Sequence, residues 1–438
     1  MPVHVGFLNV EPVISVLDEP MFTHQPTIRI TNVLPFRHRS IRDVLPPIPH
    51  SIFGKSTQFS MCENLPQELI QDIMDYLRGD RKALYACSLV CRAWNHPARS
   101  RLFSEFDLQP DKVMLLVMGA PNIIPFIRKL RLVTPTWFWK KSFCFVSGFE
   151  AVQSLWISSL PWQYLTSAAQ TTFIGQFSTV VSLHFLKIDT ASFSQFAQLI
   201  CTFRCLETLR IVGATWLNSD LPPSTLSPPP NLRAMELGNL EKKTFLQWLA
   251  SFDRPPALHT LCSLANGPAD IEAVVTFLGA LGSHLKTLQI VQNGTSVLVP
   301  TQHYSLADAM YPAYGDELVS LRHNPSLRRL YLGVWHDGSS SSESIPQTLS
   351  QIVSTEMEEV YFRVILFKHA QPDPDRWRDI DAMLARLPFF FTLKRVAVEF
   401  QVKAGQDPRP WVIPYMPQCH ARGILRVHTG VWTSAFER

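Results

Sequence analysis

A three-point apolar pattern recurs along most of this chain and limits the folds that it can adopt. After residue 120, an apolar residue is followed three and five positions later by two more; this unit occurs nine times in full and once without its third apolar residue. Six consecutive spacings between the units lie within 25 to 28 residues. A fixed period of this length predicts a solenoid in which each repeat adds one structural unit. The first positions of the units are Ile127, Val152, Val180, Leu206, Leu232, Leu258, Leu285, Leu327, Met357 and Leu393.

The last two apolar positions of each unit indicate a strand, and the stretches between units indicate helices. Apolar residues alternate in segments such as Leu155-Trp156-Ile157, which is the period of a β-strand. The stretches 192–203, 243–252 and 270–281 place apolar residues at helical spacing instead. We therefore predict an α/β fold over residues 109–400. The pattern resembles an irregular leucine-rich-repeat solenoid, with one strand and one helix per repeat.

Two departures interrupt the period. Ser263 stands where the sixth unit should have its third apolar residue. A spacing of 42 residues after Leu285 indicates an insertion at about 297–316. Insertions in solenoids map to loops on one face, often a binding face, but a passive loop is equally compatible with the sequence.

One residue in each unit, between the last two apolar positions, should point out of the strand toward the concave side of the array. Aromatic and charged residues are frequent there and are typical anchors of protein interfaces. A neighbouring loop covering Trp156 or Tyr361 is the alternative. The row is Arg131, Trp156, His184, Arg210, Glu236, Cys262, Gln289, Tyr331, Tyr361 and Ala397. The candidate target-binding residues are Trp156, His184, Arg210, Glu236, Gln289, Tyr331 and Tyr361.

Residues 61–108 have a different, helical period. Asn64 is an N-cap candidate for a first helix that Gly79 ends, and Asp80 is placed to cap a second helix. We expect that second helix to run to a break at 95–97, followed by a short third helix with Leu102 and Phe103 inward. The apolar stripe of the first helix is Leu65, Leu69, Ile73 and Leu77, and that of the second is Leu84, Cys87, Val90, Cys91 and Trp94.

The stretches LPQELIQDIMDYL and ALYACSLVCRAW, followed by ARSRLF, resemble the F-box, in a variant common among fungal F-box proteins. The resemblance implies a three-helix motif that docks onto a Skp-type adaptor, which in turn binds a cullin scaffold of a ubiquitin ligase. Spaced apolar side chains would then enter a groove of the adaptor. A plain three-helix unit packed on its own chain is the alternative. The candidate adaptor-binding residues are Leu65, Pro66, Ile73, Leu77, Val90 and Trp94.

The sequence offers no chemistry for catalysis. It contains no phosphate-binding Gly-rich loop, no HExxH helix, no GxSxG elbow and no CxxC pair. Cys87 and Cys91 lie on an apolar stripe without two further ligands, which predicts buried thiols rather than a metal site. We expect neither enzyme activity nor a cofactor, although an enzyme with scattered catalytic residues stays an open alternative.

The composition narrows the class of protein further. Forty basic against 36 acidic residues leave a formal charge of +4, which gives no indication of a nucleic-acid partner. Eight cysteines without a framework spacing favour a reducing compartment, so that we expect a cytoplasmic or nuclear protein without a signal peptide. No apolar run approaches the length of about 18 residues that a membrane span needs.

These patterns predict four segments: a leader at 1–60, a helical module at 61–108, the repeats at 109–400 and a cap or tail at 401–438. The leader has no sustained period and would be flexible, or a docking arm. Together the segments predict a substrate-recognition subunit of a Skp-cullin-F-box (SCF) ubiquitin ligase that holds an unknown protein target. A ligase-independent binding scaffold or sensor is the alternative.

Overall fold

The computed structural model describes ten ranges of the chain: 65–109, 116, 120–133, 148–223, 225–265, 268–292, 320–336, 344–365, 374–401 and 407–429. The predicted leader, the insertion at 297–316 and the N-cap candidate Asn64 lie outside the described residues.

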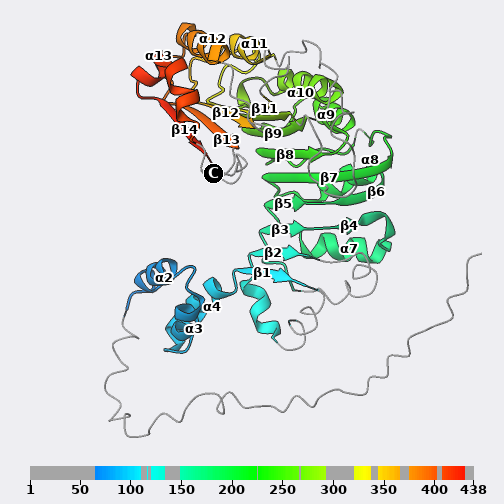
Figure 1. Cartoon of the computed structure of the whole chain (residues 1–438). Helices are drawn as coiled ribbons and strands as arrows, with labels where there is room; N and C mark the ends of the chain where they lie inside the picture. Colours follow the sequence, from blue (N-terminus) through cyan, green and yellow to red (C-terminus); the bar gives the residue numbers. More distant parts are fainter. Residues whose placement is uncertain are drawn as a thin grey trace, which may run out of the picture. The chain divides into compact units, whose positions relative to one another are not determined.

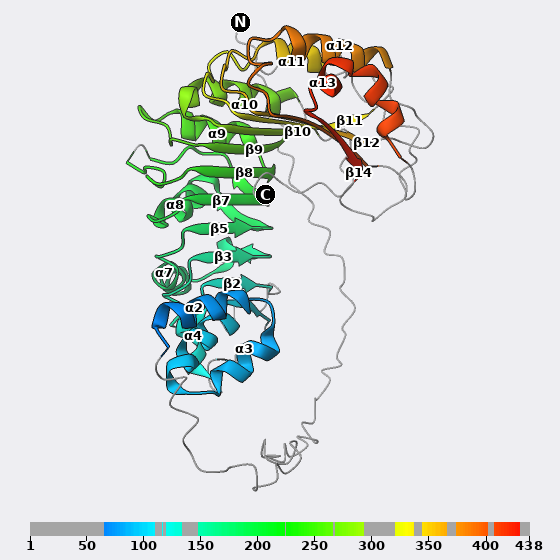
Figure 2. The ribbon, with the colours of Figure 1, turned by 90° about the vertical axis from the view of Figure 1, so that its left-hand side faces the viewer.

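The helical module contains α2 (Gln67–Tyr76), α3 (Arg81–Ser88) and α4 (Arg92–Leu102), and Figure 2 shows the three helices together. Gly79 has a φ of 113°, the left-handed conformation that glycine adopts without strain, and it lies between the first two helices. The Asp80 carboxylate then accepts a 3.0 Å hydrogen bond from the Ala83 N–H and caps α3, as the sequence predicts. The buried centre of the module is Ile70, Met74, Leu84 and Ala98.

The predicted single helix through Cys87, Cys91 and Trp94 is wrong. α3 ends at Ser88, and Cys91 is extended (φ −159°, ψ 173°) at the N-cap of α4. The Asn95 side chain donates a 2.7 Å hydrogen bond to the Ser88 carbonyl, which satisfies a backbone acceptor at the end of α3.

The predicted break at 95–97 is wrong as well, because α4 continues through the buried Pro97. The missing N–H of Pro97 costs α4 one backbone hydrogen bond, and the helix nevertheless runs on to Leu102. At the other end of the module, α2 begins after Pro66, which takes the N-cap position without a side-chain hydrogen bond.

All ten predicted strand segments form strands, and every pair of neighbours in the sheet is parallel. The predicted α/β class is thereby confirmed. The main sheet comprises β1 (Glu105–Leu108), β2 (Lys129–Leu132), β3 (Ser154–Ile157), β5 (Ser182–Phe185), β7 (Thr208–Asn218), β8 (Ala234–Asn239), β9 (Thr260–Ala265), β10 (Thr287–Gln292), β11 (Arg329–His336), β12 (Glu359–Ile365), β13 (Arg395–Gln401) and β14 (Leu425–Thr429), in this order. The short β4 (Leu160–Pro161) pairs with β6 (Ile188–Ser192), which in turn pairs with β7.

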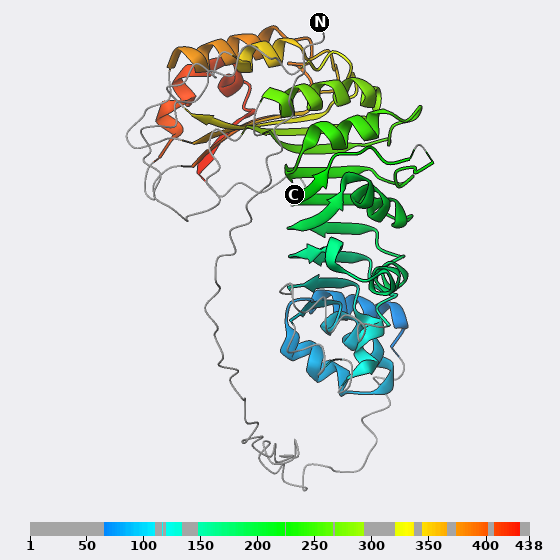
Figure 3. The same cartoon turned by 90° about the vertical axis from the view of Figure 1, so that its right-hand side faces the viewer.

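The connections between strands carry helices, which Figures 1 and 3 show along one side of the sheet. The stretches predicted as helical at 192–203, 243–252 and 270–281 form α8, α9 and α10. The helical elements of the array are η4 (Pro121–Phe126), η6 (Trp162–Tyr164), α7 (Ser167–Gln176), α8 (Phe193–Thr202), α9 (Lys242–Ala250), α10 (Pro268–Leu281), η7 (Gly282–His284), α11 (Ser344–Ser350), α12 (Pro374–Arg386), η9 (Arg409–Trp411), η10 (Ile413–Tyr415) and α13 (Pro417–Ala421).

The core lies between the sheet and these helices. The first apolar position of every repeat unit, from Ile127 to Leu393, is 1% exposed or less. Aromatic side chains fill the space under the helices, where the Phe193 ring packs on Phe245 and Trp248 at centroid distances of 6.3 and 5.7 Å. Because each repeat covers its neighbour, the buried apolar area forms one continuous cluster.

Both ends of the array extend beyond the repeats that the pattern marks. β1 pairs with β2, so residues 105–108, placed by sequence in the helical module, belong to the sheet. At the other end, β14 pairs with β13, and the buried Asp381 carboxylate accepts hydrogen bonds from the Gln418 and Cys419 N–H groups at 2.8 and 3.0 Å. Residues 407–429 therefore continue the sheet and cover its last helix layer.

Gly238 allows β8 to lie close to β7, and its substitution tests this packing. A Cβ on Gly238 would come within 2.6 Å of the Val212 carbonyl oxygen and 2.9 Å of its Cα, both backbone atoms. We expect Gly238→Ala to lower the free energy of unfolding by about 1 to 3 kcal/mol, measured by urea denaturation. The control is Gly175→Ala in α7, where nothing lies within 4 Å of the added methyl. It should raise stability by about 0.5 to 1 kcal/mol, and equal effects of the two variants would contradict the packing argument.

Candidate functional site

Helix α2 carries two apolar stripes. Ile70 and Met74 face the interior of the module and are buried, with Leu77 packed beside them. Leu69, Ile73 and Tyr76 follow the same helical spacing one residue earlier, on a second face. Leu69 is 48% exposed and Tyr76 is 90% exposed, whereas Ile73 is half-buried at the border with the core. The first stripe therefore builds the module, and we call Leu69, Ile73 and Tyr76 the outer stripe of α2.

The structure divides the predicted adaptor-binding residues into two groups. Leu65, Pro66 and Val90 are exposed. Ile73, Leu77 and Trp94 are half-buried and pack against the centre of the module. Leu69, Tyr76 and Leu89 are exposed apolar side chains that were not among the predicted contacts, although the alternation of two stripes in α2 was visible in the sequence.

The rest of the module holds these surfaces in place. Arg101 on α4 forms two hydrogen bonds with the Asp75 carboxylate on α2, at 2.5 and 3.0 Å, and lowers the pKa of that carboxyl group. Cys87 packs at the edge of the buried centre, and burial raises the pKa of its thiol. Both thiols are partly buried, and Cys87 but not Cys91 packs against the buried centre, so the expectation of two fully buried core thiols is wrong. In the described part of the chain, no group of three histidine, cysteine or acidic side chains could hold a metal ion.

The predicted outward row forms a continuous line across the helix-free face of the sheet. The strand register places each of its members directly beside the next, from Arg131 to Ala397. The row extends to Asp107 on β1 and to Arg426 on β14. The sequence thus placed these residues together correctly, but their exposure differs along the row.

The first half of the row is an accessible ladder of charged and aromatic groups, which we call the aromatic ladder: Arg131, Trp156, His184, Arg210 and Glu236. The Arg131 guanidinium lies 4.8 Å from the Trp156 ring centroid, and the His184 ring stacks on Trp156 at 5.1 Å with an interplanar angle of 22°. Arg210 lies 5.8 Å from the same indole and 3.1 Å from a Glu236 carboxylate oxygen. Cation–π contacts and stacking therefore hold these side chains in one arrangement.

The second half of the row is buried, which corrects the expectation of an exposed surface. Gln289 is 1% exposed, and Tyr331 and Tyr361 are each 4% exposed. The two tyrosine rings stack with centroids 4.3 Å apart and an angle of 8° between their planes. Tyrosines in neighbouring parallel strands lie one strand spacing apart, which is close enough for their rings to cover each other.

A polar pocket of about 280 Å³ lies beside these tyrosines on the helix-free face. Most of its lining comes from the row one step nearer to the start of the strands, where Thr260, Thr287, Arg329, Glu359 and Arg395 are successive neighbours in the register. The sequence pointed to the tyrosines but not to this second row, because only the register brings its members together.

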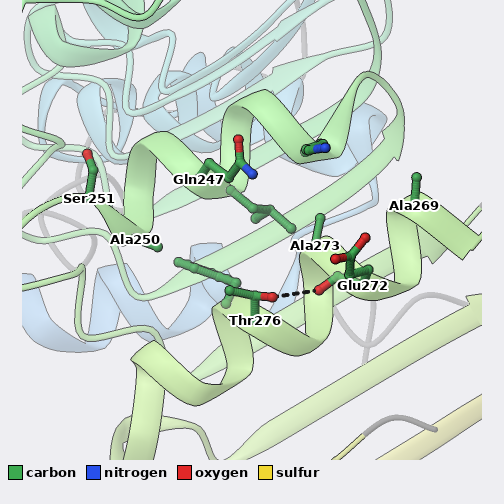
Figure 4. Close-up of a pocket in the computed structure, with 10 residues that line it drawn as sticks. Gln247, Ala250, Ser251, Ala269, Glu272, Ala273 and Thr276 are labelled. Carbon is green, nitrogen blue, oxygen red and sulfur yellow. Dashed lines mark hydrogen bonds between the residues drawn. The ribbon is translucent and has the colours of Figure 1, made fainter. Parts of the chain in front are cut away.

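A second pocket lies on the opposite side of the sheet, between α9 and α10 (Figure 4). Its volume is about 210 Å³, and Leu246, Ala250 and Phe277 line it together with Lys243 and Glu272. Its wall combines the apolar faces of two adjacent helices with a few polar side chains from the helix surface. The packing of α9 against α10 is what brings these side chains together.

Comparison with known proteins decides the nature of the module. Residues 62–109 match the family model described as F-box-like. The chain carries an F-box-like domain. The match covers the three helices and β1, so the F-box-like domain and the first strand of the sheet adjoin directly.

Other comparisons concern the whole chain. No curated protein matches it. Among solved structures, a chain in the crystal structure of the Rad7 and Elc1 complex in yeast is similar at 13% identity, with a TM-score of 0.35. That match covers 81% of this chain and 97% of the other. No helix in the ranges that the structure describes is long and apolar enough to cross a membrane.

His184 should make the stability of the array depend on pH. Burial, and then the charge of Arg210, lowers the pKa of His184 from its ordinary 6.5 to about 4. Between these values the unfolded chain binds a proton that the folded chain excludes, so stability falls as the pH drops from 6.5 toward 4. The loss should not exceed about 3 kcal/mol. His184→Phe retains a ring against Trp156 and removes this loss.

The measurement is urea denaturation of the natural chain and of His184→Phe at pH 7 and pH 4.5. Carboxylates and other histidines titrate in both proteins, so only the difference between the two pH dependences reports on His184. Identical pH dependences would contradict the argument.

Proposed function

We propose that this chain is a non-catalytic substrate receptor of an SCF ubiquitin ligase. Its F-box-like domain would bind a Skp-type adaptor and through it a cullin scaffold, while the helix-free face of the sheet would hold a protein target. The observation that carries the proposal is the outer stripe of α2, in a domain that matches the F-box-like family model.

The outer stripe has the properties of a docking surface for a groove. Leu69 and Tyr76 are exposed although the same helix already has an apolar stripe in its own core. Six of the thirteen exposed large apolar side chains in the described ranges belong to this small domain: Leu65, Leu69, Tyr76, Tyr85, Leu89 and Val90. Exposed apolar groups at this density mark a site of protein association, and their helical spacing fits helix-in-groove recognition.

The aromatic ladder supports target binding by the repeat array. Arg131 is exposed and Trp156, His184, Arg210 and Glu236 are half-buried, so that the group combines accessible area with fixed positions. Tryptophan and arginine dominate binding energy at interfaces, and ordered side chains lose less entropy when a partner binds. A receptor of this kind needs no reactive group, because it acts by raising the concentration of the target near the ubiquitin carrier.

Cullin binding, the leucine-rich-repeat assignment and a cytoplasmic or nuclear location belong to the same proposal. Each follows from the F-box resemblance, from the repeat pattern or from composition rather than from a contact in the structure.

Removing the outer stripe should abolish adaptor binding without unfolding the domain. We expect Leu69→Glu with Tyr76→Ala to eliminate co-purification of the full chain with a Skp-type adaptor. The substitutions place a charge and a void where an apolar groove would close over the helix. Because both side chains are exposed, the circular dichroism spectrum and the unfolding midpoint should stay close to those of the natural chain.

The matched control is Tyr164→Ala, which removes an aromatic ring that is 58% exposed outside the F-box-like domain. It should leave co-purification intact. Retention of the adaptor by the folded double variant would reject the outer stripe as the contact. Failure of the natural chain to bind any Skp-type adaptor would reject the receptor proposal itself.

Target binding should depend on the aromatic ladder. We expect Trp156→Ala with Arg131→Ala to reduce binding of target proteins captured by the natural chain at least about tenfold, since anchors of these types each contribute about 2 kcal/mol or more. Quantitative pull-down followed by mass spectrometry measures the loss.

The alternative function, a ligase-independent scaffold, predicts target binding without turnover of the target.

A turnover assay separates these two functions. The receptor requires that a captured target is degraded more slowly in cells that express the Leu69→Glu and Tyr76→Ala variant. Unchanged degradation with intact target binding would favour the scaffold. Equal target binding by the natural chain and the ladder variant would remove the aromatic ladder from the proposal.

A further inference from the structure

The polar pocket on the helix-free face has a charge pattern suited to an anion. Its lining contains two arginines and one carboxylate, so it has a net charge of +1. Arg329 pairs with Glu359 at 3.3 Å, and the Tyr361 hydroxyl donates a 3.2 Å hydrogen bond to the same carboxylate. These contacts involve the only carboxylate of the pocket lining. The second arginine of the lining, Arg395, takes no part in them.

Arg395 is fixed in position but has no anionic partner within the described ranges. Its guanidinium lies 5.2 Å from the centroid of the Tyr361 ring, which restricts the side chain. Its Nε is buried and makes no hydrogen bond. A buried N–H without an acceptor is costly, and an anion beside the guanidinium would compensate its charge.

Two threonines complete the opposite side of the pocket. Thr260 and Thr287 are adjacent in the register of β9 and β10, and both line the cavity. Their hydroxyls can donate to an anionic oxygen, as the Arg395 guanidinium can. The pocket thus has hydroxyl donors at one end and a guanidinium donor at the other.

The residues just before strands β8, β9 and β10 add further positive charge beside the pocket. Arg233, His259 and Lys286 immediately precede the paired residues at the start of β8, β9 and β10. Burial lowers the pKa of His259, and the nearby charges of Lys286 and Arg233 lower it further. Farther along this edge, Arg328 and Lys394 are neutralised by Glu356 and Glu358 at 2.9 and 3.0 Å. Arg233 and Lys286 have no such ion pair within the described residues, and we call these two residues the basic edge. It borders the pocket because Lys286 directly precedes Thr287, which lines the cavity.

The charge balance favours a carboxylate over a phosphate. A single carboxylate neutralises the net charge of +1 in the pocket, whereas a phosphate group with nearly two negative charges would leave an excess beside Glu359. The volume of about 280 Å³ admits a glutamate side chain. Further carboxylates of the same segment would lie along the basic edge, where they interact at longer range.

We propose that the pocket binds a carboxylate side chain from an acidic segment of the target protein, with Arg395 as its main partner. The inference rests on the proposed function, since it names the chemical class of the segment that the receptor would hold. The aromatic ladder lies on the same face of the sheet and would contact other parts of the target.

The test measures binding of a fluorescein-labelled hexaglutamate peptide with an amidated C-terminus to the purified full chain, by fluorescence anisotropy at low ionic strength. Arg395→Gln should weaken binding about tenfold, the loss expected for one charge-assisted hydrogen bond. Arg395→Lys retains the charge and should lose less. The control Arg386→Gln removes an exposed arginine from the end of α12 and should bind like the natural chain.

Different outcomes overturn different parts of the inference. Equal affinity of the natural chain and Arg395→Gln, or the same loss in Arg386→Gln, would show that net charge alone attracts the peptide. A greater dependence on Arg395 for a phosphoserine peptide than for hexaglutamate would overturn the choice of a carboxylate. Matching circular dichroism melts of the three variants exclude unfolding as the cause of a loss.

The adaptor is absent from this assay, so its result is independent of the ligase assignment. Arg395-dependent peptide binding by a chain that fails to bind the adaptor would overturn the proposed function and leave the pocket assignment in place. Adaptor binding without peptide binding would overturn the pocket assignment alone.

Discussion

Parallel pairing of successive strands is the interaction on which the rest of the array depends. It places the middle apolar residue of each repeat, from Leu130 through Leu209 to Val396, directly beside its counterpart in the next repeat. Each strand buries these residues only because a neighbour and a helix cover them, so a single repeat has no core of its own. At the ends of the described array, β1 and β14 continue the pairing beyond the repeats that the pattern marks.

The same pairing arranges the polar side chains on the other face of the sheet in rows. Neighbours in a row are one strand spacing apart, which allows Arg131, Trp156 and His184 to stack and also allows Tyr331 to cover Tyr361. A row therefore becomes accessible or buried according to the sizes and charges of its consecutive members. The aromatic ladder and the polar pocket are two results of this rule on one surface.

The F-box-like domain is organised by a different constraint. Three short helices bury a small centre, so few apolar residues suffice to hold them together, and the Asp75–Arg101 pair adds a link between α2 and α4. Because so few apolar residues are needed for the core, Leu69 and Tyr76 lie outside it. A partner that covered these exposed apolar side chains would remove them from water and so stabilise this small domain.

The sequence by itself determined the ten repeat strands, three of the helices that cover them and the place of the F-box-like domain, because periods of 2 and 3.6 residues are local and fix which side chains turn inward. It also aligned the outward row from Arg131 to Ala397. Only the tertiary structure decided which part of that row is exposed, where α3 ends, and that Arg395 shares a pocket with Thr260. These features bring together residues up to four repeats apart, and the register that creates them is a property of the assembled sheet.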